Sequence, residues 1–96
     1  MFYSVTPALY EEIRIRLTDA VGTAGYFSGL LTFDFGDVAC TLRCSLIVCR
    51  RSERLPEGTF DRLTDLLPVW WEFHTVLPDG SEPLNDFSFD ELRRML

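Results

Sequence analysis

The clearest indication of the fold is the stretch Tyr26-Phe-Ser-Gly-Leu-Leu-Thr-Phe-Asp-Phe-Gly-Asp-Val-Ala-Cys-Thr-Leu-Arg-Cys-Ser-Leu-Ile-Val-Cys-Arg50. Both of its halves alternate as strands do, and Gly36-Asp37 between them is a two-residue signal for a hairpin turn. If Phe35 opposes Val38, the register pairs Phe33 with Cys40, Leu31 with Leu42, Gly29 with Cys44 and Phe27 with Leu46. Alternation assigns these same residues to one face, so pairing and burial agree, and a slip of one residue would spoil both.

An amphipathic helix precedes this hairpin. Thr6-Pro7 is a hydroxyl N-cap followed by proline at the first helical position. Apolar residues then recur at helical spacing from Leu9 to Val21, and Glu12 and Arg16 are placed for an i,i+4 ion pair. Gly22 ends the predicted helix.

The segment after residue 50 is less regular. Leu55-Pro-Glu-Gly58 predicts a turn. The spacing of apolar residues over 60–67 indicates one or two helical turns, with an extended connection as the alternative. Pro68 ends that segment, because the residue before proline is disfavoured in helices. Alternation from Val69 to Leu77 then predicts a third strand, on which Trp71 shares the core face with Phe73.

A turn and a second helix close the chain. Pro78-Asp79-Gly80 predicts the turn, and Pro83 restricts any returning strand to a sheet edge. Ser88 and Glu91 form a capping-box pattern. The order helix, hairpin, third strand, helix predicts a single α+β domain over residues 1–96. Its expected architecture is a two-layer α-β-β-β-α fold, with a three-stranded antiparallel sheet and both helices on one face.

Length and charge limit the function classes. The 96 residues carry a formal net charge of −6 and no lysine. No apolar run approaches the roughly 20 residues of a membrane span, and the first residues lack the pattern of an export signal. We therefore expect a cytoplasmic protein without a membrane partner. An arginine cluster at Arg50, Arg51 and Arg54 and an acidic C-terminal third are most simply solvated surface.

The cysteines Cys40, Cys44 and Cys49 all fall within the second predicted strand. Cys40 and Cys44 are about 13 Å apart in an extended chain, too far for the roughly 7 Å between Cα atoms that a disulfide tolerates. We expect three reduced thiols. The cysteine spacing and the single histidine do not form a zinc-binding pattern, and no nucleophile elbow or phosphate-binding glycine motif is present. The sequence therefore predicts no metal, no cofactor and no catalytic residue.

The predicted topology resembles that of double-stranded-RNA-binding domains. Those domains are similar to one another in a basic helix N-terminus that contacts phosphate. Here the corresponding helix opens with Asp90 and Glu91. With a negative net charge as well, we expect no binding to nucleic acid near 0.15 M salt.

The sheet face opposite the helices is the strongest candidate site. Parity places large apolar residues there among a few charges, a composition typical of protein interfaces. Two explanations remain open: this face binds a partner, or residues 60–67 or the N-terminus fold across it. The residues are Tyr26, Leu30, Thr32, Arg43, Ile47, Trp70, Glu72, His74 and Val76.

The last third of the chain carries a resemblance. Pro68-Val-Trp-Trp-Glu-Phe-His-Thr75, followed by Asn85-Asp-Phe-Ser-Phe89, is similar to small uncharacterised single-domain proteins of Bacteroides-type bacteria, some of which travel with mobile elements. The resemblance implies a bacterial cytoplasmic protein and no particular activity.

These observations favour a small acidic, non-catalytic protein-interaction module, whose partner is another protein or a second copy bound through the outer sheet face or a strand edge. One alternative is a DNA-mimicking inhibitor that presents its carboxylates to a nucleic-acid-binding protein. The other is a small-ligand binder or enzyme centred on Trp70, Glu72 and His74. A concave pocket at His74 would favour the ligand, and a flat apolar face the interface.

Overall fold

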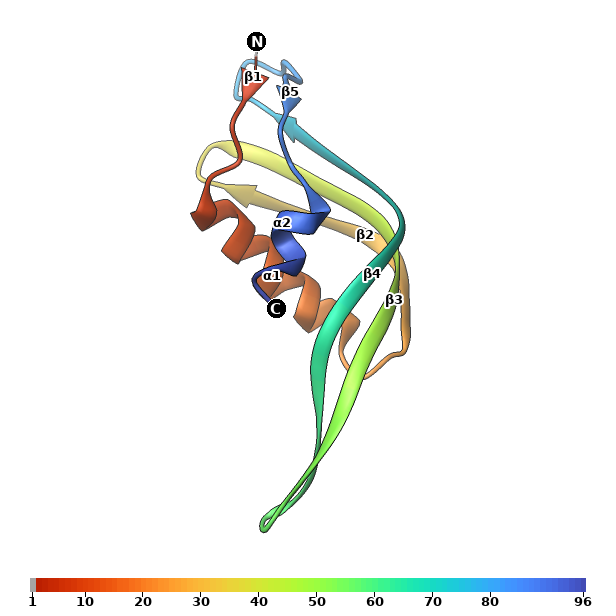
Figure 1. Ribbon diagram of the computed structural model, residues 1–96. Helices are drawn as coiled ribbons and strands as arrows, with labels where there is room; N and C mark the ends of the chain where they lie inside the picture. The colour runs from red at the N-terminus through yellow and green to blue at the C-terminus, as the bar shows by residue number, and fades with distance from the viewer. Residues whose placement is uncertain (1) are drawn as a thin grey trace.

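The computed structural model describes residues 2–96 and contains a three-stranded antiparallel sheet with a helix near each end of the chain (Figure 1). This coarse α+β prediction is confirmed. A short parallel strand pair, β1 with β5, was not predicted. In chain order the elements are β1 (Phe2–Tyr3), α1 (Pro7–Val21), β2 (Tyr26–Phe35), β3 (Val38–Leu55), β4 (Gly58–Val76), β5 (Leu84–Asn85) and α2 (Phe89–Arg93).

The β2–β3 hairpin has the register that its sequence predicts. Phe35 opposes Val38 across the Gly36-Asp37 turn, and Phe27 opposes Leu46 at the far end. Gly36 adopts a φ of 63°, a left-handed conformation that glycine reaches without a Cβ clash. The pairing is continuous over all ten residues of β2. Local turn chemistry and face alternation therefore specify the same hairpin.

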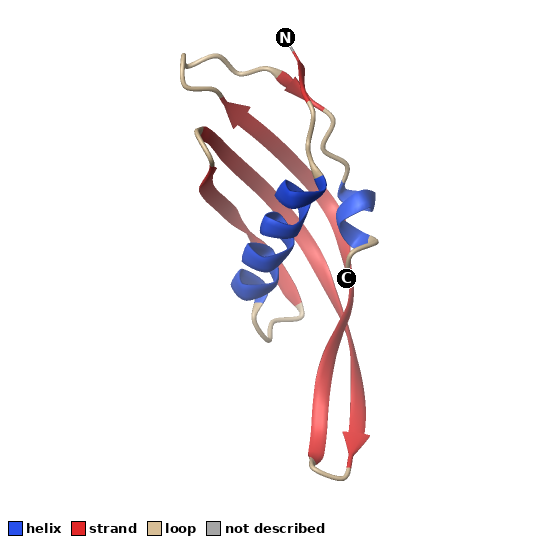
Figure 2. Cartoon of the chain, turned by 90° about the vertical axis from the view of Figure 1, so that its left-hand side faces the viewer, coloured by secondary structure: helices blue, strands red, loops and turns tan. Residues whose placement is uncertain are grey.

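Helix α1 packs on one face of this sheet, and α2 lies on the same side (Figure 2). The Thr6 side chain accepts a hydrogen bond from the Leu9 amide at 3.2 Å, and Arg16 pairs with Glu12 at 2.7 Å, both as predicted. The apolar stripe of α1 is buried in the same core cluster as the inner residues of the central strand β3. The fully buried core includes Leu9, Ile13, Leu17, Cys40, Leu42, Cys44, Leu46 and Leu92.

The helical prediction for residues 60–67 was wrong, because this segment is strand. β3 continues to Leu55, Gly58 turns the chain, and β4 pairs back from there. The paired ends project beyond the helices as a two-stranded arm, defined here as residues 50–63 (Figure 1). The molecule is consequently 53 Å long but only 23 and 19 Å across. Backbone pairing with β3 satisfies the N–H and C=O groups that the two strands direct toward each other, and this outweighs the weak local preference for helix.

Pro68 does not begin the third strand but lies inside β4. The register shifts beside it, so that Ser45 pairs with Trp70 while the next residue, Leu46, pairs with Pro68. Val69 is the extra residue of this bulge. A bulge accommodates proline in a strand because the ladder is already interrupted there.

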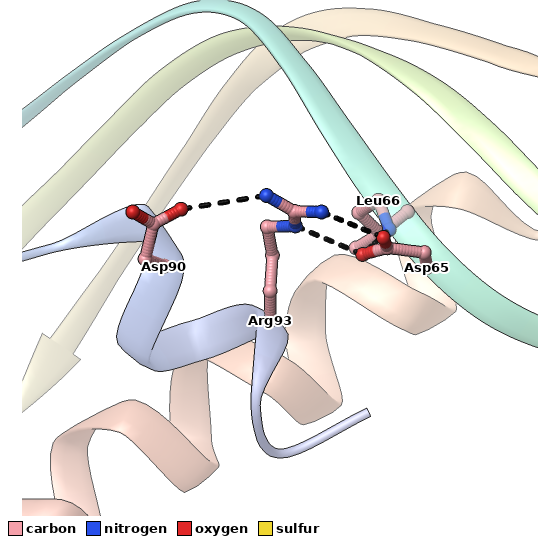
Figure 3. Close-up of polar contacts among 4 residues, drawn as sticks. All are labelled: Asp65, Leu66, Asp90 and Arg93. Carbon is pink, nitrogen blue, oxygen red and sulfur yellow. Dashed lines mark hydrogen bonds and ion pairs between the residues drawn. The ribbon is translucent and has the colours of Figure 1, made fainter.

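Helix α2 is attached by an ion pair as well as by its apolar side. The Arg93 guanidinium donates two hydrogen bonds to the Asp65 carboxylate, at 2.9 and 2.7 Å, and also reaches Asp90 at 3.4 Å (Figure 3). The predicted capping-box hydrogen bond is absent: Ser88 occupies the N-cap, but its side chain makes no capping contact. Its backbone amide instead donates to the Tyr10 hydroxyl at 3.0 Å. This hydrogen bond to α1 takes the place of the predicted capping-box contact at the Ser88 amide.

Trp71 lies on the predicted inner face but is not a core residue. It opposes the buried Cys44, yet 38% of its surface is exposed. Its ring contacts Phe87 edge-on, with centroids 5.2 Å apart, and Phe87 stacks on Phe73 at 4.6 Å. β4 is the last strand of the sheet, so Trp71 has a neighbouring strand on one side only, and its other side stays open to solvent.

Candidate functional site

The nine residues that the sequence assigns to this surface all lie exposed on the sheet face opposite the helices, which we call the outer face. The strand register arranges them in rows: Tyr26 opposes Ile47, and Leu30, Arg43 and Glu72 follow one another across the three strands. Trp70 opposes Ser45, and His74 opposes Thr41. The exposed members are Tyr26, Leu30, Thr32, Arg43, Ile47, Trp70, Glu72, His74 and Val76.

The apolar residues of the outer face remain accessible to solvent. The exposed fraction is 56% for Tyr26, 50% for Leu30, 48% for Ile47 and 42% for Trp70. Residues 60–67 extend the sheet instead of folding over it, and no segment within residues 2–96 shields these side chains. The second explanation given for this surface, that residues 60–67 or the N-terminus fold across it, therefore does not hold for the described chain.

A further apolar residue belongs to the outer face. Leu67 opposes Ile47 in the register and is exposed, and Val69, the bulged residue beside Trp70, is exposed as well. Sequence reasoning missed Leu67 because it began the third strand after Pro68. The apolar run from Leu66 to Trp71 was the available signal, since a proline within a continuous run also suits a bulged strand.

Charges on the outer face are few. Arg43 lies directly opposite Glu72, a cross-strand arrangement of opposite charges. Both His74 ring nitrogens face carboxylates, with Nε2 at 3.1 Å from Glu72 and Nδ1 at 2.7 Å from Glu82. His74 lies at the rim of a shallow open groove lined also by Phe73 and Asn85. Because both nitrogens are engaged within the chain, this groove does not offer a free imidazole to a ligand.

The geometry does not form a catalytic pair from Cys49 and His74. Cys49 opposes Asp65 and His74 opposes Thr41, so eight residues of β3, about 26 Å of strand, separate them. Cys40 and Cys44 are buried, and burial raises the pKa of each thiol to about 11. A buried, protonated thiol is a poor nucleophile. Within residues 2–96, no group of three or more acidic, histidine or cysteine side chains could hold a metal ion.

The acidic C-terminal third is occupied with internal contacts. Asp86 accepts a hydrogen bond from the Val5 amide at 2.7 Å, and Asp79 accepts one from the Ser81 hydroxyl at 2.6 Å. Glu82 faces His74, Asp90 faces Arg93, and Glu91 pairs with Arg94 at 2.5 Å. A DNA mimic needs carboxylates that are free to replace phosphates, and these have structural partners.

The mid-chain arginine cluster is only partly solvated. Arg51 and Arg54 are exposed on the arm, whereas Arg50 reaches the loop after α1. Its guanidinium donates to the carbonyl oxygens of Gly22 and, at 3.1 Å, Ala24. A cation at a helix C-terminus satisfies carbonyls that the helix leaves unpaired. Arg50 therefore fixes the connection between α1 and β2.

The chain matches no protein-family model, and comparisons with curated proteins and with solved structures found no similar protein. No helix within residues 2–96 is long and apolar enough to cross a membrane.

Proposed function

We propose that this protein is a small, non-catalytic interaction module that binds a protein partner through its outer face. The observation that carries the proposal is that Tyr26, Ile47 and Trp70 stay half exposed on a sheet face that the described chain leaves uncovered. Exposed apolar surface of this kind is costly in water and is usually covered by a partner.

The composition of the outer face supports a protein partner over a nucleic acid. Its centre is aromatic and aliphatic, and its charged pair, Arg43 and Glu72, is balanced. Aromatic residues with arginine are enriched at the centres of protein interfaces, whereas nucleic-acid sites need excess positive charge to neutralise phosphates. The formal net charge of −6 opposes a nucleic acid as well.

The proposal places the module in the bacterial cytoplasm. That location follows from the resemblance to small Bacteroides-type proteins and from three cysteines that form no disulfide.

Affinity capture from native cell extract, read by quantitative mass spectrometry, tests the proposal. The baits are wild type, Ile47→Asp on the outer face, and Ile15→Asp on α1. Ile15 is a matched control because its exposed fraction, 49%, is close to that of Ile47 but its side chain is not on the sheet. We expect proteins that wild type and the Ile15→Asp variant both retain and that the Ile47→Asp variant loses. Identical sets for all three baits would contradict the proposal.

A further inference from the structure

The two edges of the three-stranded sheet are built differently. The β4 edge is interrupted by two register shifts and by Pro68, and the Asn85 side chain donates to the Phe73 carbonyl oxygen at 3.0 Å. Such devices prevent a further strand from adding. The β2 edge has none of them: its ten residues include no proline, no arginine and a single charge, Asp34, and its register is unbroken. Within residues 2–96, no strand pairs with its free side.

Apolar surface flanks the β2 edge on both sides of the sheet. On the outer face, Tyr26 and Leu30 are half exposed. On the inner face, Phe27, Leu31 and Phe35 pack against the core but are only partly buried, because α1 does not cover them fully. About half of the residues in an edge strand also point their backbone N–H and C=O groups away from the sheet. A strand added at this edge would pair those groups and cover both apolar sides.

We propose that the β2 edge pairs antiparallel with β2 of a second copy of this chain, about a two-fold axis at either Leu30 or Leu31. The two three-stranded sheets then form one continuous six-stranded sheet. This goes beyond the proposed function but relates to it, since it adds a self-association contact separate from the outer face and joins two outer faces side by side.

The pattern of β2 fits a second copy because it is complementary to itself. Residues directly opposite in an antiparallel pair share a face, and a two-fold axis at Leu30 or Leu31 preserves that parity. Apolar inner residues then meet apolar inner residues, for example Phe27 with Phe33 or Phe35 of the other copy. The one charged residue, Asp34, meets a hydroxyl-bearing side chain, Tyr26 or Ser28, and never its own copy.

The dimensions of the β2 edge also favour a second copy of the chain as its partner. β2 is about 33 Å long, and the sheet and helix layers together are about 20 Å thick, so the edge could bury about 660 Å² per copy. The total, about 1,300 Å², falls within the range of stable interfaces. One outer face alone, about 33 by 14 Å, offers only about 460 Å², below the roughly 800 Å² per partner of a standard interface. Pairing at β2 doubles that surface.

Sedimentation equilibrium on wild type, Thr32→Lys and Thr59→Lys tests the pairing. Thr32 is an exposed residue of β2, and Thr59 is an exposed strand threonine near the tip of the arm, so it serves as the control. A lysine on an edge strand opposes pairing while leaving the hairpin intact. We expect wild type and Thr59→Lys to be dimers and the dissociation constant of Thr32→Lys to rise about tenfold or more. A monomeric wild type, or equal constants for all three, would overturn the pairing.

Disulfide trapping independently tests which residues of the two copies lie close together. In a Cys49→Ser background, Leu30→Cys and Leu31→Cys place a thiol at the proposed axis, where the two Cα atoms would be about 4.5–5.5 Å apart. We expect at least one of them to form a covalent dimer under mild oxidation. Ile47→Cys would be about 14 Å or more from its counterpart and should stay monomeric. Crosslinking through Ile47→Cys alone would overturn edge pairing and show face-to-face contact instead. Loss of the edge contact leaves the capture experiment to decide the outer-face function separately.

Discussion

The two faces of the sheet both carry large apolar residues but differ in environment. On β3, the inner residues Cys40, Leu42 and Cys44 are fully buried beneath the helices, whereas Ile47 on the outer face is half exposed. Strands with one solvated face normally alternate apolar with polar residues. Here the outer face is also apolar at several positions, although the described chain covers only the inner one. The inner face therefore forms the core, and the outer face is the surface that we propose for association.

Thiol reactivity should separate the two faces most strongly. Cys40 and Cys44 are buried on the inner face with pKa values of about 11, so only about 0.1% of each would be thiolate at pH 8. Cys49 lies opposite Asp65 and is only partly buried. We expect one thiol per chain to react with Ellman's reagent under native conditions and three in denaturant, with native protection of about a hundredfold or more for the other two. Three fast thiols in native protein would contradict the buried face.

Truncating matched aliphatic residues on β3 should come next in size. Leu42→Ala removes a fully buried side chain and should cost about 2–5 kcal/mol of unfolding free energy. Ile47→Ala, on the outer face of the same strand, should cost about 1 kcal/mol or less, because its side chain is already half exposed. Urea titrations of both variants measure the difference. Equal costs would mean that the outer face is also part of a core.

The ion pair that attaches α2 to the sheet should make stability depend on pH. Hydrogen bonds from Arg93 hold the pKa of Asp65 below its usual value. The stabilisation is therefore present above the unfolded pKa, about 4, and is lost as pH falls through the lower folded pKa. Asp65→Asn should lower the melting temperature at pH 7, and the difference in melting temperature from wild type should shrink toward pH 2. If that difference stays the same over this range, the role of Asp65 is not electrostatic.

The smallest expected effect concerns a buried hydroxyl. Thr75 is fully buried on β4, and its Oγ1 has no hydrogen-bond partner in the described chain. Thr75→Val removes the unpaired group at nearly the same volume and should raise stability by up to about 1 kcal/mol. Thr32→Val, on the exposed outer face, is the control and should change little. Thermal melts of both variants in parallel would show whether only Thr75→Val raises the melting temperature.

The parts of the fold that local chemistry specifies could be predicted from the sequence. The Gly36-Asp37 turn sets the β2–β3 register, and Thr6 and Gly22 mark the ends of α1, all as expected. The outer-face residues followed from that register by parity alone. Their function does not follow from position, because the sequence does not distinguish an apolar residue that stays exposed from one that another segment of the chain covers.

The parts that depend on distant contacts could not be predicted. Residues 60–67 have helical spacing, and only pairing with an extended β3 makes them strand. Trp71 has the parity of a core residue, but its exposure depends on β4 being the last strand of the sheet. The ion pair between Asp65 and Arg93 joins residues 28 positions apart. Each case depends on a tertiary neighbour that no local pattern identifies.

The adjacent tryptophans offer the sharpest comparison of the two faces, since they lie on opposite faces of β4 and have similar exposed fractions, 42% for Trp70 and 38% for Trp71. Trp71 contacts Phe87 and Phe89, so Trp71→Ala should cost about 2–3 kcal/mol, below the range for a fully buried aromatic residue. Trp70→Ala should cost about 1 kcal/mol or less and remove binding of the captured partner.

Thermal melting and partner capture on the two variants give the comparison. We expect the Trp70→Ala protein to melt near wild type and no longer bind, and the Trp71→Ala protein to be destabilised but to bind when folded. If Trp70→Ala lost as much stability as Trp71→Ala and still bound its partner, the outer face would not be the binding surface.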